Sequence, residues 1–201
     1  MMAFKIKRNT AIGFVDLSRV SSAIKRLATA ASANLGSDCY IHAAIAQRIL
    51  AKLGVESRIV VGYAAWRVGN GDSDVILHVP IPGMPVQEGG VAYHVWLEIG
   101  SKILDFTTYQ LLDKAAHLDE LDGETTDVVW CPDFLFVPKK SVSPLQKVIQ
   151  LRAGLYFYMR NTAVEEKIVL TAPTLDEDDV ETAWLLYQKP EIKVFGPNHM
   201  L

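Results

Sequence analysis

Cys39 is one of two cysteines in the 201-residue sequence, and its position favours a reactive thiol. It stands in the stretch GSDCYIHAAIAQRILAKLG, whose apolar residues recur every three or four positions and predict a helix. Ser37 or Asp38 is expected to cap this helix and Gly54 to follow its last turn, so Cys39 falls in the first turn. The positive end of the helix dipole stabilises a thiolate there, and the thiolate is the nucleophilic form of cysteine.

A base and an orienting carboxylate are expected on one β-hairpin. The segments VAYHVWLEI and KILDFTT read as two strands, and the Gly-Ser pair between them favours a type II′ turn. In that register His94, Trp96 and Asp105 project from one face, while the opposite face is apolar and predicts core. His94 and Asp105 are then diagonal neighbours, roughly 7–8 Å apart along the backbone. A carboxylate at that place can fix the tautomer of the imidazole and stabilise its protonated form.

Cysteine, histidine and aspartate together suit acyl transfer, in which a thiolate attacks a carbonyl carbon and a histidine moves the protons. The structural alternatives are an inert buried cysteine and a solvated His–Asp pair. His78, in a second short strand, is a rival base that has no acidic residue at hairpin spacing. A zinc site formed by Cys39, His42, His94 and Asp105 is disfavoured because the sequence lacks close ligand pairs such as C-x-x-C or H-x-x-x-H.

The order of elements predicts an α+β fold with a mostly antiparallel sheet. Two helices come first, followed by strands, and the last third mixes both kinds of element. An acidic helix near the C-terminus is expected to begin with a capping box formed by Thr174 and Glu177. The other expected elements are a helix over 16–33, strands over 57–68, 75–80, 127–137 and 154–160, a helix over 110–121, a helix after Ser143, and an ambiguous run over 163–170.

Composition indicates a globular protein of ordinary charge. Half of the residues are hydrophobic, 21% are charged, and the formal net charge of −3 excludes an electrostatic footprint for nucleic acid. The sequence shows no secretory signal, no apolar run of about 20 residues and no disulfide framework, so we expect a cytoplasmic protein without a membrane span. We expect one domain over 1–201, with a catalytic-type core over about 12–108 and a C-terminal extension over 109–201.

Three segments, read in order, resemble the transglutaminase-like group of the papain-like cysteine peptidase superfamily: CYIHAAIAQRILAKLGVESRIVVGY, YHVWLEI and LDFT. That group has a helix beginning with cysteine, a strand with arginine followed by Gly-Tyr, a histidine near an aromatic residue and a glutamate, and an aspartate that begins a D-x-T turn. The match covers about residues 34–108. It implies a papain-like core with the Cys-bearing helix packed on an antiparallel sheet, and it implies Cys39 as nucleophile, His94 as general base and acid, and Asp105 as orienting carboxylate.

The sequence departs from this resemblance at the oxyanion hole. The papain group carries a glutamine a few residues before its cysteine, whereas the amide found here is Asn34, five residues upstream. We expect the backbone N–H of Cys39 to stabilise the oxyanion, with Asn34 beside it and Trp96 lining the substrate pocket. The Arg-x-Gly-Gly-x-Cys form of the arylamine acetyltransferase branch is missing, so coenzyme A is not implied and we expect no cofactor.

The sequence therefore predicts a cysteine hydrolase of the peptidase or amidase kind, acting on a peptide, an isopeptide or a side-chain amide. Its expected partner is that amide-containing substrate, with neither nucleic acid nor membrane. One alternative is a non-catalytic binding module that keeps the same fold. Another is a structural or partner-binding role centred on the C-terminal third. The substrate, the acyl acceptor and the oligomeric state are left open by the sequence.

Overall fold

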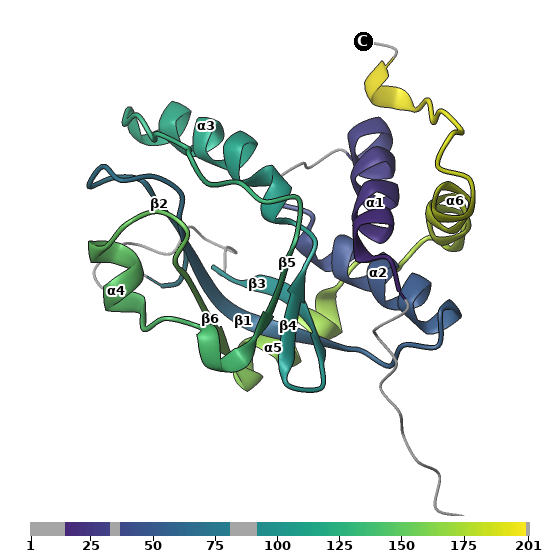
Figure 1. Ribbon diagram of the computed structural model, residues 1–201, viewed down its shortest axis with the longest axis horizontal. Coiled ribbons are helices and arrows are strands. Elements are labelled where there is room, and N and C mark those ends of the chain that lie inside the picture. The colour runs from purple at the N-terminus through teal and green to yellow at the C-terminus, as the bar shows by residue number, and fades with distance from the viewer. Residues whose placement is uncertain (1–14, 33–36, 81–91, 200–201) are drawn as a thin grey trace, which may run out of the picture.

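An antiparallel sheet forms the centre of the structure, a computed structural model that describes residues 15–32, 37–80 and 92–199. All pairings between its six strands are antiparallel (Figure 1), and the chain is accordingly of the α+β class. The strands are β1 (Arg58–Arg67), β2 (Val75–His78), β3 (His94–Ile99), β4 (Lys102–Asp105), β5 (Leu135–Pro138) and β6 (Tyr156–Arg160).

Helices lie on both sides of this sheet, and three of them pack together on one side. α2 contacts β3 directly, while α1 and α6 cover α2 (Figure 1). No helix in the described ranges is long and apolar enough to cross a membrane. The helices are α1 (Leu17–Ala31), α2 (Cys39–Lys52), α3 (Leu111–Asp122), α4 (Leu145–Gln150), α5 (Thr162–Thr171) and α6 (Glu177–Gln188), and short 3-10 turns cover Thr108–Gln110, Lys139–Ser141 and Pro197–His199.

β1 connects the two halves of the sheet, because it pairs with β2, β3 and β6. β4 follows β3 as the second strand of the hairpin, and β5 pairs with β4. β5 and β6 come from the last part of the chain, so residues beyond the hairpin complete the sheet that carries it. β6 approaches β1 closely at Gly62, where an added Cβ would lie 2.1 Å from the carbonyl oxygen of Met159.

Both faces of the sheet are buried, each by a different set of side chains. On the side of α1, α2 and α6 the core is aliphatic: Val95, Leu97 and Leu104 of the sheet pack with Ile24, Ile45, Ile49 and Leu186 of these helices. The other face is rich in aromatic residues and includes Trp66, Trp96, Ile103, Leu135 and Tyr158. The hairpin is therefore enclosed on both sides, and the polar groups on its second face need partners inside the protein.

The structure confirms the hairpin and both N-terminal helices. β3 and β4 pair Leu97 with Leu104 and Ile99 with Lys102, the register that the Gly100–Ser101 turn predicts. α2 begins at Cys39, and Gly54 follows it with a positive φ of 75°, as expected of a glycine after a helix end.

Three local predictions are wrong or incomplete. The run over 127–137 yields only β5, because its first half extends past β1 and β2 without joining a ladder beyond a few backbone bonds. The ambiguous run over 163–170 is helix α5, capped by the Asn161 side chain, which accepts a hydrogen bond from the N–H of Val164. The capping box at Thr174 is not formed, because the Asp176 side chain caps α6 instead.

Candidate active site

The first turn of α2 and the β3–β4 hairpin bring Cys39, His94 and Asp105 together. His94 is the first residue of β3 and Asp105 the last of β4, so both lie at the same end of the hairpin. His94 Nε2 lies 2.8 Å from Asp105 Oδ2. Both residues are buried, with 2% of His94 and 1% of Asp105 exposed. The alternative of a solvated His–Asp pair is therefore wrong. The diagonal contact inferred from the turn register is confirmed.

The carboxylate of Asp105 accepts four hydrogen bonds. Its Oδ2 accepts from His94 Nε2 and, at 2.7 Å, from the hydroxyl of Tyr158. Its Oδ1 accepts from the backbone N–H of Thr107 at 2.9 Å and from the Thr107 hydroxyl at 2.7 Å. Burial alone would raise the pKa of Asp105, but the His94 charge and these donors outweigh it and lower the pKa to about 2. The carboxylate is therefore ionised inside the protein.

The imidazole of His94 is correspondingly held in its protonated form. Burial would lower its pKa, but the charge of Asp105, its hydrogen bond and the nearby Cys39 sulfur together raise the pKa to about 9. The edge of Trp66 packs on the ring at a centroid distance of 4.7 Å. Nε2 faces Asp105, whereas Nδ1 is buried without a regular hydrogen bond to any described residue. This leaves Nδ1 to exchange a proton with the thiol side of the site.

Cys39 lies against a small pocket of about 20 Å³, a volume that suits about one water-sized group. The thiol is free, and Cys39 as a whole is 8% exposed. The first N–H groups of an α-helix have no partner inside the helix. Those of α2 lie at its N-terminal end, where Cys39 borders the pocket. The side chains around the cavity come from α2, β1, β2, β3 and the start of α3: Cys39, Trp66, His78, His94, Thr107, Gln110, Leu111 and Lys114.

Asp38, directly before the nucleophile candidate, is hydrogen-bonded in a separate network. Its side chain does not cap α2, in contrast to the prediction. Instead Oδ2 accepts from Ser32 at 2.6 Å and Oδ1 from Gln110 Nε2 at 3.1 Å. His42, buried one turn later, bonds to the Asp38 carbonyl and to the Tyr109 hydroxyl, so it has a structural role. The carboxylate beside Cys39 is thus bound by two donors, Ser32 and Gln110.

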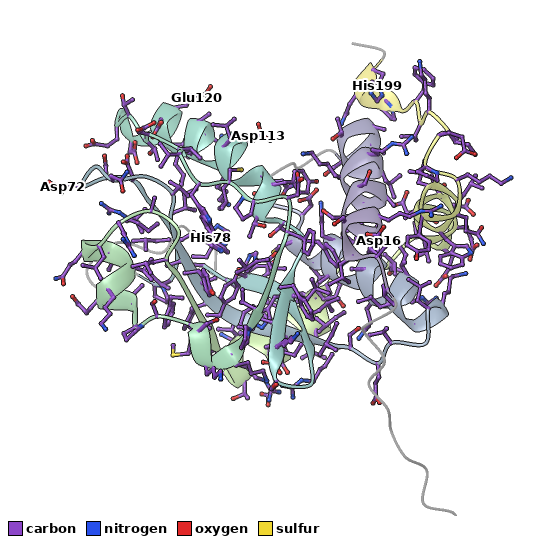
Figure 2. All side chains as sticks on the ribbon, in the orientation of Figure 1. Asp16, Asp72, His78, Asp113, Glu120 and His199 are labelled. Atoms are coloured by element: carbon purple, nitrogen blue, oxygen red, sulfur yellow. The ribbon has the colours of Figure 1, made fainter. Side chains whose placement is uncertain are left out.

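His78 also reaches the cavity, between α3 and the sheet (Figure 2), but without a carboxylate partner. Its Nδ1 lies 3.1 Å from the carbonyl oxygen of Tyr93. Burial, followed by the charges of Lys114 and His94, lowers the pKa of His78 well below its usual value. Because it stays neutral and lacks an acidic partner, the structure favours His94 over His78 as the base.

The remaining predicted site residues divide into two groups. Trp96 stacks behind the His94 ring at a centroid distance of 6.3 Å and is buried, so it does not line the cavity. Asn34 lies outside the described residues.

Sequence reasoning missed Tyr158, whose hydroxyl also accepts from Trp66 Nε1 at 2.9 Å, and it missed Gln110 and Lys114. No signal in the sequence ties Tyr158 to Asp105, because 53 residues separate them.

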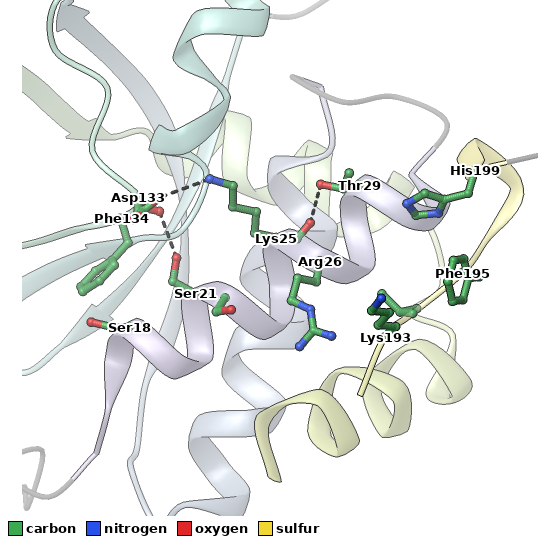
Figure 3. Close-up of a pocket in the computed structure, with 12 residues that line it drawn as sticks. Ser18, Ser21, Lys25, Arg26, Thr29, Asp133, Phe134, Lys193, Phe195 and His199 are labelled. Atoms are coloured by element: carbon green, nitrogen blue, oxygen red, sulfur yellow. Dashed lines mark hydrogen bonds and ion pairs between the residues drawn. The ribbon is translucent and has the colours of Figure 1, made fainter. Parts of the chain in front are cut away.

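A larger cavity of about 640 Å³ lies along α1, next to the C-terminal 3-10 turn (Figure 3). It shares no lining residue with the cavity at Cys39. Its polar side chains bond to groups of the protein: Lys25 to Asp133 at 3.2 Å, Ser21 to the Asp133 carbonyl and Arg26 to the Pro190 carbonyl. In the described part of the chain no group of three or more His, Cys, Asp or Glu side chains is placed to hold a metal ion.

The two pKa shifts predict how the pair stabilises the fold at different pH. The pKa of His94 is raised from 6.5, so its stabilising contribution is complete below pH 6.5 and is lost as the pH rises through about 9. The pKa of Asp105 is lowered from 3.8, so its contribution is complete above pH 3.8 and is lost as the pH falls through about 2. The difference in unfolding free energy between wild type and Asp105→Asn, measured by urea denaturation, should therefore peak between these limits. A difference that does not change with pH would contradict the assigned ionisation states.

Comparison with known proteins supports the fold but gives no information about the function. No protein-family model matches the sequence, and no curated protein matches it. A crystal structure of the genomics target APC5867 is similar, with a TM-score of 0.61 at 16% sequence identity. The similarity covers 88% of this chain and 80% of that chain. At this identity the likeness concerns the fold alone.

Proposed function

We propose that the protein is a cysteine-dependent acyl-transfer enzyme, a hydrolase that cleaves amide bonds of peptides, isopeptides or side chains. The observation that carries this proposal is the buried, hydrogen-bonded Asp105–His94 pair placed against the thiol of Cys39 at a helix N-terminus. The α+β fold, with the Cys-bearing helix packed on an antiparallel sheet, agrees with the papain-like, transglutaminase-like core that the sequence resembles.

The proposed reaction starts from the Cys39 thiolate beside the His94 imidazolium, whose Nδ1 carries the proton that the thiol has given up. The thiolate attacks the carbonyl carbon of the substrate, forming a C–S bond and a tetrahedral oxyanion. The N–H groups in the first turn of α2 are placed to stabilise that oxyanion. The imidazolium then donates its proton to the amide nitrogen, the C–N bond breaks, and an amine leaves behind a thioester on Cys39.

Water completes the cycle in the second half. His94, neutral after the first half, takes a proton from the attacking water while the oxygen bonds to the thioester carbon. Collapse of this second intermediate expels the Cys39 thiolate and releases a carboxylic acid, and the imidazolium is restored. Asp105 stays ionised throughout, and it stabilises the imidazolium and holds the ring orientation.

The geometry favours turnover over a non-catalytic binding module. A buried ionised pair costs desolvation energy and is weak evidence for stability, since apolar side chains of similar volume often stabilise a fold as well or better. Here the pair is supported by donors from Thr107 and Tyr158, and His94 borders the same pocket as Cys39. A perturbed, partnered histidine beside a thiol and a cavity is the arrangement expected of an active site.

Acyl-enzyme formation tests the proposal directly. Incubation with 4-nitrophenyl acetate should release a burst of nitrophenolate equivalent to the protein and add one acetyl group, which peptide mass spectrometry should locate on Cys39. Cys131→Ser is the matched control, because Cys131 is the second free thiol and lies outside the Cys39 cavity. Its burst should equal that of wild type, whereas Cys39→Ala should show none. Equal acetylation of both cysteines, or none on Cys39, would refute the acyl-transfer function.

A further inference from the structure

The larger pocket, of about 640 Å³, has walls from three segments of the chain (Figure 3). One wall is the outer side of α1, the second is the stretch just before β5, and the third is the C-terminal segment over 193–199. Its volume lies within the roughly 300–1,000 Å³ that is typical of small-molecule sites. The pocket is therefore large enough for a ligand of metabolite size, at a place remote in the lining from Cys39.

The C-terminal wall is attached to α1 on both sides of the pocket. Arg26 donates to the Pro190 carbonyl at 2.9 Å, and the side-chain amide of Asn198 donates to two carbonyls at the C-terminal end of α1. Between these bonds Gly196 lies against the helix, where an added Cβ would be 2.4 Å from the Ala30 carbonyl oxygen. The folded chain itself thus forms the pocket, and no ligand is needed to draw its walls together.

The lining has an excess of two positive charges. Lys25, Arg26 and Lys193 contribute three cations, and Asp133 is the one carboxylate among the lining residues. The Lys25–Asp133 pair is exposed at 3.2 Å, and an exposed pair of this kind holds its partners weakly. Arg26 uses one of its five N–H donors on Pro190, and Lys193 has no hydrogen-bond or ion-pair partner among the described residues. The free donors of this lining attract an anion, in a chain whose formal net charge is −3.

Aromatic side chains form another part of the lining. Phe195 is 76% exposed, although phenylalanine is usually buried. Its ring meets that of His199 at a centroid distance of 5.8 Å, and Phe134 contributes a second phenyl ring to the pocket. On α1, Ser18 and Ser22 have short side chains, which leave room beside the helix. Accessible aromatic rings of this kind stack on the flat ring systems of ligands.

We propose that this pocket binds a phosphate monoester of a flat ring compound, with the dimensions of a nucleoside monophosphate. Arg26 and Lys193 hold the phosphate, and Phe195 contacts the ring. A phosphate monoester carries about −1.5 to −2 charges at neutral pH, which matches the excess positive charge of the lining. Its oxygens accept charge-assisted hydrogen bonds from guanidinium and ammonium groups. This binding does not depend on the chemistry proposed for Cys39.

Isothermal titration calorimetry of the full chain with adenosine monophosphate, adenosine and inorganic phosphate tests the site. Adenosine monophosphate should bind at least about 10-fold more tightly than either of its parts, because it alone engages both the cations and the aromatic ring. Lys193→Gln should weaken its binding about 10-fold, the effect of losing one charge-assisted hydrogen bond. Phe195→Ser should lower the affinity for adenosine monophosphate toward that for inorganic phosphate and leave the binding of phosphate unchanged. Lys189→Gln, at an exposed position outside the pocket, is the matched control and should bind like wild type.

The possible results either support the site or overturn it. Lys193 and Phe195 are exposed, so both variants should unfold at the wild-type temperature, which is measured alongside. Cys39→Ala keeps every lining residue of this pocket and should bind adenosine monophosphate like wild type, so failure of the acyl-transfer function is seen separately. Absence of binding in wild type overturns the proposal. Equal affinity for adenosine or for inorganic phosphate, or unchanged binding in Lys193→Gln and Phe195→Ser, overturns it as well.

Discussion

Replacing His94 with alanine is expected to slow the alkylation of Cys39 by iodoacetamide about 10- to 100-fold near pH 6. In wild type the imidazolium persists to about pH 9 and stabilises the thiolate beside it. Without the imidazolium this stabilisation of the thiolate is lost, so less of the nucleophilic form is available to react. The rate is measured by mass spectrometry of the Cys39 peptide between about pH 5 and 9.

Two comparisons make this result specific. His117→Ala removes an exposed histidine of α3 and should leave the alkylation profile unchanged. Cys131 serves as an internal reference in every sample, because it is exposed and far in sequence from the pair. If Cys39 in wild type is alkylated no faster than Cys131 near pH 6, or if His94→Ala has the wild-type profile, then Cys39 is not activated by His94.

Replacing Asp105 with alanine is expected to destabilise the fold by about 3–5 kcal/mol, the usual cost of removing one partner of a buried ion pair. Four donors lose their acceptor at once: His94 Nε2, the Tyr158 hydroxyl, and the N–H and hydroxyl of Thr107. Asp105→Asn should cost less, because its amide oxygen still accepts. The free energy of unfolding is measured by urea denaturation at about pH 6.

Asp105→Asn also tests how the carboxylate charge affects the pKa of His94, because asparagine has nearly the same size as aspartate. Without the carboxylate charge, only the Cys39 sulfur still opposes the effect of burial, so the pKa of His94 should fall from about 9. NMR of the imidazole resonances measures it. Asp113→Ala, at an exposed position of α3, is the matched control and should change neither the stability nor the His94 resonance appreciably. A cost below about 1 kcal/mol for Asp105→Ala would contradict a buried, fully bonded carboxylate.

Local sequence signals predicted the part of the site that lies on neighbouring strands. The Gly100–Ser101 turn determines the register of the hairpin, and the register places His94 next to Asp105. The cap residues and Gly54 located Cys39 at the start of α2. These relations depend on residues close together in the chain, where turn geometry and side-chain periodicity leave few alternatives.

The parts that sequence reasoning missed depend on contacts between distant segments. The aromatic face of the sheet is covered by side chains such as Trp66 and Tyr158, which only the pairing of β6 with β1 brings together. For the same reason, the periodicity of the hairpin correctly indicated an apolar face but did not reveal that the polar face is enclosed as well. Asp38 resembled a cap by residue type, but its oxygens are bound by Ser32 and Gln110. A short-range motif competes there with tertiary hydrogen bonds, and the tertiary bonds prevail.

The position of Tyr158 has a consequence for how the protein folds during its synthesis. A ribosome delivers the chain from its N-terminus, so Cys39, His94 and Asp105 emerge while the tyrosine 53 residues after Asp105 is still to be synthesised. Until β6 adds to β1, the carboxylate lacks one of its four donors and the aromatic cover of His94 is incomplete. A nascent chain therefore holds its thiol without the finished proton-transfer machinery. In the proposed enzyme, late assembly of this kind would keep the nucleophile unreactive toward neighbouring polypeptides until synthesis is nearly complete.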